Sequence, residues 1–147
     1  MAESYVLDTG VLLLLARGKT LGTSIAGRYG LLNPGVRPLV SVVSHGELWA
    51  LARRNQWGDK RLSFVRQDVL GNVVTVELIQ PVIDAYVELD YASFKHPDGA
   101  RNMGKNDLWI AATARAAQAT LITTDTDFEH LHPHLLKREL VEMSTGT

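Results

Sequence analysis

The sequence contains no cysteine among its 147 residues. Disulfides and cysteine-based zinc or iron–sulfur sites are therefore excluded, and any chemistry rests on carboxylates, histidines, hydroxyl groups or the backbone. Long apolar runs are also missing, because Gly10–Ala16, the longest near the start, is far too short to span a bilayer. The N-terminal residues do not resemble a secretory signal. We therefore expect a cytoplasmic protein with no membrane partner.

Glycine-rich nucleotide-binding motifs are absent as well. Neither a Walker motif nor a G-x-G-x-x-G fingerprint is present, which argues against a nucleotide-dependent motor or a dehydrogenase. The sequence has no repeat, low-complexity tract or linker, and its length is typical of one domain. With 46% apolar residues, residues 1–147 are expected to form a single domain with a proper hydrophobic core.

Charge is nearly balanced overall, at −1, but it is unevenly distributed along the chain. Residues 1–66 hold nine Lys and Arg residues against four acids, giving +5, whereas residues 67–147 hold six against twelve, giving −6. A basic half can supply contacts to phosphate groups. The alternative interpretation is a set of solvated helix faces.

Strand-like and helix-like segments alternate along the sequence. The expected strands are Ser4–Asp8, Arg37–Val43, Asn72–Leu78 and Ala119–Asp125. The expected helices are a run to about Arg17, part of 22–36, Ser44–Asn55, Asp59–Leu70, a segment that begins near Pro81, and Gly104–Ala117. A turn is expected at "NPG" (33–35) and a loop at "KHPDGARNMGK" (95–105). Apolar strands that alternate with helices favour a largely parallel sheet covered by helices on both faces.

Acidic residues recur where these strands end and the following helices begin. The set consists of Asp8, Glu47, Asp107, Asp125 and Asp127, with Glu47 and Asp107 expected in the first turns of their helices. Strand ends and following helix starts share one edge of a parallel sheet, so these carboxylates are expected to point at one end of the domain. Such a cluster repels itself, and a divalent cation relieves the repulsion. Oxygen ligands favour Mg²⁺ or Mn²⁺ over zinc.

Each acid also has a purely structural explanation. Asp8 is suited to capping a helix, and Ser44–Glu47 has the S-x-x-E pattern of a capping box. Asp107 in a first turn complements the helix dipole by about 0.3–1 kcal/mol, and "TTDTD" suits a turn. Because an acid recurs at the same edge of successive strand–helix units, we favour a metal site. A carboxylate pocket that holds such ions suits phosphodiester hydrolysis.

Four segments resemble the acidic motifs of PIN-domain proteins, with an order and spacing most similar to VapC-type toxins. They are "YVLDTGVLL", "SVVSHGEL", "GKNDLWIAATA" and "LITTDTDF". The resemblance implies a three-layer α/β/α sandwich with a central, mainly parallel sheet. It also implies endoribonuclease activity that depends on one or two Mg²⁺ or Mn²⁺ ions. A homodimer and a cognate antitoxin protein, whose tail covers the active site, are implied as well.

The family's functional residues map onto this sequence within those motifs. The residues that match its catalytic, metal-binding acids are Asp8, Glu47, Asp107 and Asp125. Asp127 matches a position that is often acidic and acts through water, and Thr9 matches a hydroxyl residue that orients a metal ligand. Gly10 departs from the pattern, because the family often has Ser or Asn there; the departure affects fine geometry and leaves the acids intact.

Other features have weaker functional interpretations. Arg53 and Arg54 are candidates for contacts with RNA phosphate or with an antitoxin, against a solvated helix face as the default. His130, His132 and His134 alternate in "HLHPHL", a spacing that invites a zinc or nickel site, but a surface or core-edge segment is favoured. Among the aromatic residues, the Trp at position 57 is considered for base stacking or a dimer contact.

Two other classes of function are weighed against the nuclease. A non-catalytic PIN-like module would bind RNA or protein, but clustered negative charge gives no advantage for binding phosphates alone. A receiver-like domain needs an acidic pair after the first strand, where only Asp8 stands. A dehalogenase-type phosphatase needs D-x-D-x-T, where this chain reads "DTGVL". Both of these α/β rivals fit poorly.

Overall fold

The computed structural model describes residues 3–31, 33, 35–97 and 103–142. At its centre is a five-stranded sheet, entirely parallel, in the order β3-β2-β1-β4-β5. The strands are β1 (Tyr5–Leu7), β2 (Leu39–Ser41), β3 (Val74–Val76), β4 (Thr120–Thr123) and β5 (Arg138–Leu140). The first strand is therefore the middle one, and its neighbour β4 comes from more than a hundred residues later in the chain.

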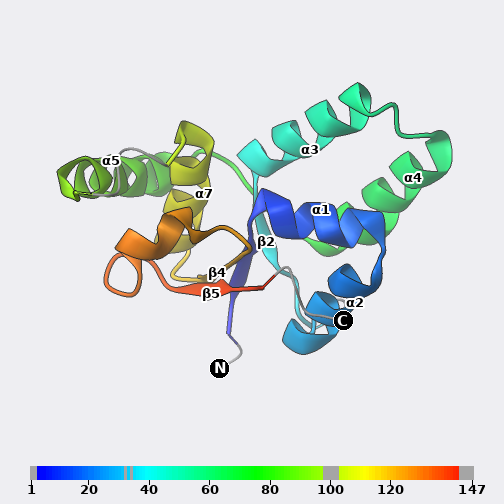
Figure 1. Cartoon of the computed structure of the whole chain (residues 1–147), viewed down its shortest axis with the longest axis horizontal. Coiled ribbons are helices and arrows are strands. Elements are labelled where there is room, and N and C mark those ends of the chain that lie inside the picture. Colours follow the sequence, from blue (N-terminus) through cyan, green and yellow to red (C-terminus); the bar gives the residue numbers. More distant parts are fainter. Residues whose placement is uncertain (1–2, 32, 34, 98–102, 143–147) are drawn as a thin grey trace.

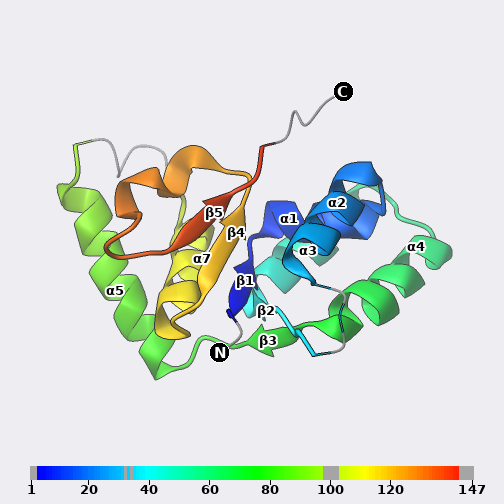
Figure 2. The same cartoon turned by 90° about the horizontal axis from the view of Figure 1, so that it is seen from below.

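Helices cover both faces of this sheet (Figure 1). One layer holds α1 (Thr9–Arg17), α2 (Thr20–Tyr29), α3 (Val42–Arg54), α4 (Asp59–Phe64), a π-helical turn η1 (Val65–Val69) and a 3-10 turn η2 (Leu70–Asn72). The other layer holds α5 (Gln80–Lys95), α7 (Lys105–Ala116) and the 3-10 helix η3 (Thr126–Leu131). Figure 2 shows the two layers on either side of the strands. The expected three-layer α/β/α sandwich is confirmed.

Two hydrophobic cores form because successive residues of a strand point to opposite faces of the sheet. Val6 and Leu121 pack against α5 and α7, whereas Leu7 and Ile122 pack against α1, α2 and α3. All four side chains are fully buried. Both faces of the central strands β1 and β4 are therefore covered, as is usual in parallel sheets, whereas the edge strands β3 and β5 are more exposed.

The start of α3 differs from the sequence expectation. The strand predicted for Arg37–Val43 ends at Ser41, and the helix begins at once with Val42. The Ser41 hydroxyl accepts a hydrogen bond from the backbone N–H of Val43 (3.1 Å) and caps the helix. The predicted capping box at Ser44–Glu47 is therefore wrong, because both of its end residues lie inside α3.

Other elements match the expectation with shifted or altered ends. The helix expected over Asp59–Leu70 continues from α4 into the π-helical and 3-10 turns. Strand β5 and helix η3 were not anticipated from the sequence. The expected turn at 33–35 and loop at 95–105 include Pro34 and residues 98–102, which lie outside the described residues. Among the described helices, none is both long and apolar enough to cross a membrane.

Helices α1 and α2 meet at unusually close range. Gly18 ends α1 in the left-handed conformation (φ 63°), and its N–H bonds to the carbonyl oxygen of Leu15 (3.1 Å). The chain then turns back, and Gly22 of α2 lies against the carbonyl of Leu14. A Cβ atom at Gly22 would lie 2.3 Å from that oxygen, so only glycine fits this contact.

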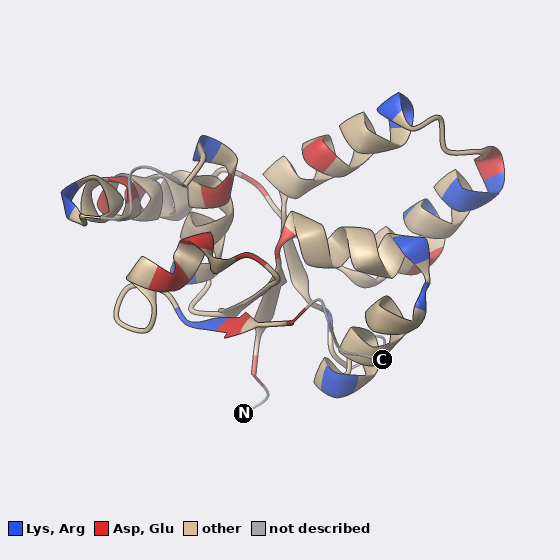
Figure 3. Ribbon diagram, viewed as in Figure 1, with Lys and Arg blue, Asp and Glu red and all other residues tan. Residues whose placement is uncertain are grey.

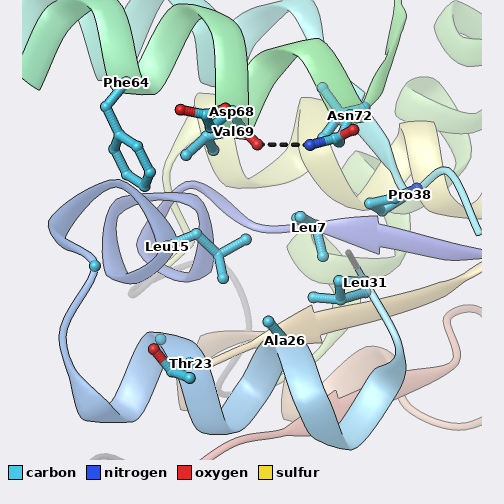
Figure 4. Close-up of a pocket in the computed structure, with 13 residues that line it drawn as sticks. Leu7, Leu15, Thr23, Ala26, Leu31, Pro38, Phe64, Asp68, Val69 and Asn72 are labelled. Atoms are coloured by element: carbon cyan, nitrogen blue, oxygen red, sulfur yellow. Dashed lines mark hydrogen bonds between the residues drawn. The ribbon is translucent and has the colours of Figure 1, made fainter. Parts of the chain in front are cut away.

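An apolar cavity of about 230 Å³ lies between α1, α2 and the η1–η2 segment (Figure 4). Leu7, Leu15 and Leu31 line it, and its polar edge includes Asp68 and Asn72. The Asn72 amide donates a hydrogen bond to the backbone oxygen of Asp68 (2.7 Å), so these two polar groups at the edge of the cavity are paired with each other. None of the acids singled out in the sequence lines this cavity.

Candidate active site

Asp8 and Asp125 follow neighbouring strands in the centre of the sheet. Asp8 comes directly after β1 and caps α1, because its Oδ1 accepts a hydrogen bond from the N–H of Thr9 (2.8 Å). Asp125 lies two residues beyond β4 and caps η3, with its Oδ1 bonded to the N–H of Asp127 (2.9 Å). The structural explanations of both acids therefore hold, and they place both carboxylates at one edge of the sheet.

Three of the five acids converge closely. Asp107, in the first turn of α7, offers a carboxylate oxygen that lies within 4.8 Å of oxygens from Asp125 and Asp127. Within the described residues, no other three His, Asp or Glu side chains come together in this way. All three are partly exposed, so an ion can reach them from solvent.

Asp8 is the most deeply placed of the acids, with 6% of its surface exposed. Its Oδ2 accepts a hydrogen bond from the hydroxyl of Thr123 (2.6 Å), and the same hydroxyl oxygen accepts one from the N–H of Asp125 (3.0 Å). Thr123 is completely buried at the end of β4. One threonine therefore fixes the acid after β1 relative to the acid after β4. Sequence reasoning did not single it out.

Glu47 is held from two other elements. Its Oε1 accepts a hydrogen bond from the Thr9 hydroxyl (2.6 Å), and its Oε2 accepts one from the Asn106 amide (3.3 Å). Ser44, buried one turn earlier in α3, has its hydroxyl oxygen 2.9 Å from that of Thr9. Since α3 begins at Val42, Glu47 is in the second turn and not in the first turn as predicted. The sequence anticipated neither Asn106 as a partner of Glu47 nor Ser44 as a partner of Thr9.

Burial and neighbouring negative charges raise the pKa of Asp107 and of Asp8. The pKa of Asp107 is raised to about 6, first by burial and then by the negative charges of Asp8, Asp125, Glu47 and Asp127. Burial also raises the pKa of Asp8, against hydrogen bonds from Thr123 and Thr9 that lower it. All the charges that act on Asp107 are negative. A bound cation would relieve this electrostatic repulsion. The oxygen donors fit Mg²⁺ or Mn²⁺.

The raised pKa of Asp107 predicts how pH changes the stability of the metal-free protein. The folded state holds the proton up to about pH 6, whereas the unfolded chain releases it near the ordinary value of 3.8. This contribution to stability is therefore present at low pH and is lost as pH rises between those values. Urea unfolding in EDTA at pH 4.5 and 7 is expected to show a larger loss in the wild type than in Asp107→Asn. The expected difference is about 1–2 kcal/mol after allowance for partial exposure. Equal losses in the two proteins would contradict it.

The two arginines proposed for phosphate contacts lie away from the acids. Arg53 and Arg54 are exposed at the C-terminal end of α3, about 10 Å along the helix from Glu47. They belong to a wider bias in charge, because Lys and Arg concentrate on α1 to α4 (Figure 3). Trp57 is partly buried against the core beneath α1 and α3, with the Arg61 guanidinium 5.3 Å from its ring centroid.

The three histidines of "HLHPHL" do not share one face of a strand. His130 lies in η3, and its Nε2 is 2.7 Å from the hydroxyl of Ser93 on α5. His132 follows the helix, and its Nδ1 accepts a hydrogen bond from the N–H of Arg138 (3.2 Å). His134 is exposed in the turn before β5. Within the described residues these side chains form no group of three potential ligands.

Gly10 lies beside the site in the first turn of α1. A Cβ atom at this position would lie 3.1 Å from the hydroxyl of Thr124, the residue directly after β4. A side chain here would press on the segment that leads to Asp125. Because glycine has no side chain, the segment from Thr124 to Asp125 has enough space beside α1.

The comparisons with known proteins agree with the fold. The family model for the PIN domain matches residues 5–132, and no curated protein sequence matches the chain. VapBC-1 from nontypeable Haemophilus influenzae is 25% identical, with a TM-score of 0.74 over 92% of this chain and 96% of that one. VapBC2 from Rickettsia felis is 20% identical, with a TM-score of 0.75 over 92% and 97%. VapC20 from Mycobacterium tuberculosis, described as a sarcin-ricin loop cleaving toxin, is 18% identical, with a TM-score of 0.61 over 91% and 99%. This chain therefore belongs to the PIN domain family.

Proposed function

We propose that this protein is a metal-dependent endoribonuclease and the toxin of a toxin–antitoxin pair. The observation that carries the proposal is the convergence of carboxylate oxygens of Asp107, Asp125 and Asp127 within 4.8 Å, where the charges that act on Asp107 are all negative. Maintaining such repulsion in a folded protein is costly unless a cation binds there. Membership of the PIN family, and similarity to the M. tuberculosis toxin described as cleaving the sarcin-ricin loop, support the same activity.

The proposed ligands of one or two Mg²⁺ or Mn²⁺ ions are Asp8, Glu47, Asp107 and Asp125, with Asp127 assisting through water. When bound, such an ion lowers the pKa of water and neutralises charge on the phosphate. The chain itself fixes the carboxylates: Thr123 holds Asp8, and Thr9 holds Glu47. Preorganised oxygens of this kind keep the geometry constant while the RNA phosphate enters.

Partners are proposed on the same basis. Arg53 and Arg54 are exposed cations suited to RNA phosphates that flank the cleaved bond. Similar solved structures include a toxin–antitoxin complex from Klebsiella pneumoniae, 19% identical with a TM-score of 0.69 over 95% of this chain. We therefore propose a cognate antitoxin protein for this chain.

Metal removal provides the direct test of this function. Purified protein is expected to cleave total RNA in Mg²⁺ or Mn²⁺ and to lose that activity in EDTA, with recovery when metal is restored. The products are expected to carry 5′-phosphate and 3′-hydroxyl ends, which end-labelling reports. Cleavage that persists in EDTA would contradict a metal-dependent site. Calorimetric metal binding without cleavage of any RNA would instead favour a non-catalytic binding module.

A further inference from the structure

An open groove of about 630 Å³ lies where α1 and α3 end and α4 begins. Both α1 and α3 start beside the acids, because Asp8 caps α1 and Glu47 lies in the second turn of α3. From Thr9 to Arg17 the helix α1 covers about 12 Å. Asp59, the first residue of α4, does not line the groove. The groove is therefore a second concave surface, at the other end of the two helices that carry these acids.

The groove is positively charged, and no acid of the described chain lines it. Its cations are Arg17, Lys60 and Arg61, all of them exposed. Arg53 and Arg54 precede it in the last turn of α3, and Figure 3 shows Lys and Arg gathered around these helix ends. The one salt bridge of the described residues joins α5 to α7, so none of these five cations is in an ion pair. Such unneutralised positive charge attracts a polyanion.

Flat side chains distinguish the groove from a plain charged surface. Phe64 is 37% exposed and is the one exposed large hydrophobic side chain in the α1–α4 layer of the described chain. Figure 4 shows its ring pointing from α4 toward α1. The Arg61 guanidinium lies over the ring of Trp57, 5.3 Å from the ring centroid. Because the bases of single-stranded RNA stack on aromatic rings and on guanidinium planes, the groove offers two stacking surfaces.

Two amide side chains complete the groove in the turn between α3 and α4. Asn55 and Gln56 are both exposed, and Gln56 adopts the left-handed conformation (φ 54°). An amide both donates and accepts hydrogen bonds, as the edge of a base does. An acidic peptide would use the cations of the groove but would gain little from its amides and rings. The combination therefore favours RNA over an acidic peptide as the occupant.

We propose that this groove binds a single-stranded segment of the RNA substrate, away from the bond that is cleaved. Phe64 and the Arg61–Trp57 pair stack against bases. Arg17 and Lys60 contact phosphates. The length of α1 between the acids and the groove corresponds to about four stacked nucleotides at roughly 3.4 Å each. The inference rests on the proposed function, because it takes RNA as the substrate, but it concerns a surface separate from the metal site.

RNA binding in EDTA tests the groove without cleavage. The probe is a short fluorescent single-stranded RNA of random sequence, whose anisotropy is followed at several salt concentrations. Phe64→Leu keeps the apolar bulk and loses the stacking surface, so affinity is expected to fall by roughly 5–150-fold, as for the loss of one stacked base. Lys60→Gln is expected to reduce the slope of log affinity against log salt by about 0.7, the share of one phosphate contact. Lys137→Gln, on an exposed residue before β5, is the charge-matched control and is expected to change neither quantity.

Cleavage of total RNA in Mg²⁺ separates this inference from the proposed function. Phe64→Leu and Lys60→Gln are expected to raise KM and to leave kcat unchanged, because they weaken binding without touching the acids. Asp107→Asn is expected to bind the probe at least as tightly as the wild type while it loses cleavage. Circular dichroism of each variant reports that it is folded.

The outcomes differ for the groove and for the acidic site. No binding by the wild type, or equal binding by the wild type, Phe64→Leu and Lys60→Gln, would overturn the groove as an RNA site even if the protein cleaves RNA. Binding that depends on the groove, without cleavage of any RNA, would support the groove and contradict the nuclease. If Lys60→Gln weakens binding of polyglutamate and of RNA equally, and Phe64→Leu weakens neither, the groove serves an acidic protein and the proposal is overturned.

Discussion

Replacing Asp107 with Asn is expected to reduce metal-dependent RNA cleavage by roughly 10²–10³-fold, the loss typical for one preorganised electrostatic group. Asn keeps the size of the side chain and one oxygen, so α7 starts as before. It lacks the charge that attracts a cation beside Asp125 and Asp127. Because the other acids all repel Asp107, the same change is expected to raise the melting temperature in EDTA at pH 7. Activity and metal-free stability therefore move in opposite directions.

Initial rates and melting curves of the two proteins, with and without Mg²⁺, measure this prediction. Asp59→Asn is a matched control, because Asp59 also lies in the first turn of a helix, α4, and belongs to no acidic group. It is expected to retain full activity. A folded Asp107→Asn with wild-type rates would remove Asp107 from the site, whereas equal losses in both variants would assign the effect to helix electrostatics.

The largest expected effect on stability comes from Gly22→Ala. The new methyl group would lie 2.3 Å from the carbonyl oxygen of Leu14. This oxygen belongs to the backbone of α1, so no change of side-chain rotamer can move it away. Helices α1 and α2 must then separate. We expect a loss of about 3 kcal/mol, at the upper end of the usual cost of overpacking, and a fall in melting temperature of roughly 6–12 °C.

Gly27→Ala on the same helix is the control for this effect. A Cβ atom at Gly27 meets nothing within 4 Å, so the higher helix propensity of alanine is expected to stabilise the protein by up to about 1 kcal/mol. Thermal melts of both variants under the same conditions measure whether the melting temperature falls for Gly22→Ala and rises for Gly27→Ala. Similar changes at both positions would show that helix propensity, and not the contact with α1, dominates at Gly22.

The parallel sheet was predictable because its central strands carry apolar residues toward both faces, and few other arrangements bury such segments. The start of α3 was not, because "SVVSHGE" offers two serines that suit a helix cap. Ser41 caps the helix, since the strand ends there and Ser44 is buried beside Thr9. Strand β5 escaped prediction because "REL" is short and mostly polar. It exists through pairing with β4, where the N–H of Leu121 bonds to the carbonyl of Lys137 (2.8 Å).

The position of the acids at one edge followed from the order of strands and helices. The groups that hold them did not, because Thr123 and Asp8 are 115 residues apart and Asn106 and Glu47 are 59 apart. Hydrogen bonds between such distant residues leave no periodic pattern in the sequence. A threonine at the end of a buried strand is the one local signal, and the sequence alone does not distinguish a threonine that holds a carboxylate from one that only packs.

The middle place of β1 in the sheet has a consequence for synthesis of the protein. The first acid emerges from the ribosome early, but the strand that completes its surroundings, β4, emerges more than a hundred residues later. Pairing of such distant segments is slow, and it waits for both to be present. A nascent chain that stops before Asp125 lacks two of the three converging carboxylates. The acidic site therefore forms late in synthesis, and a chain that is interrupted before Asp125 cannot complete it.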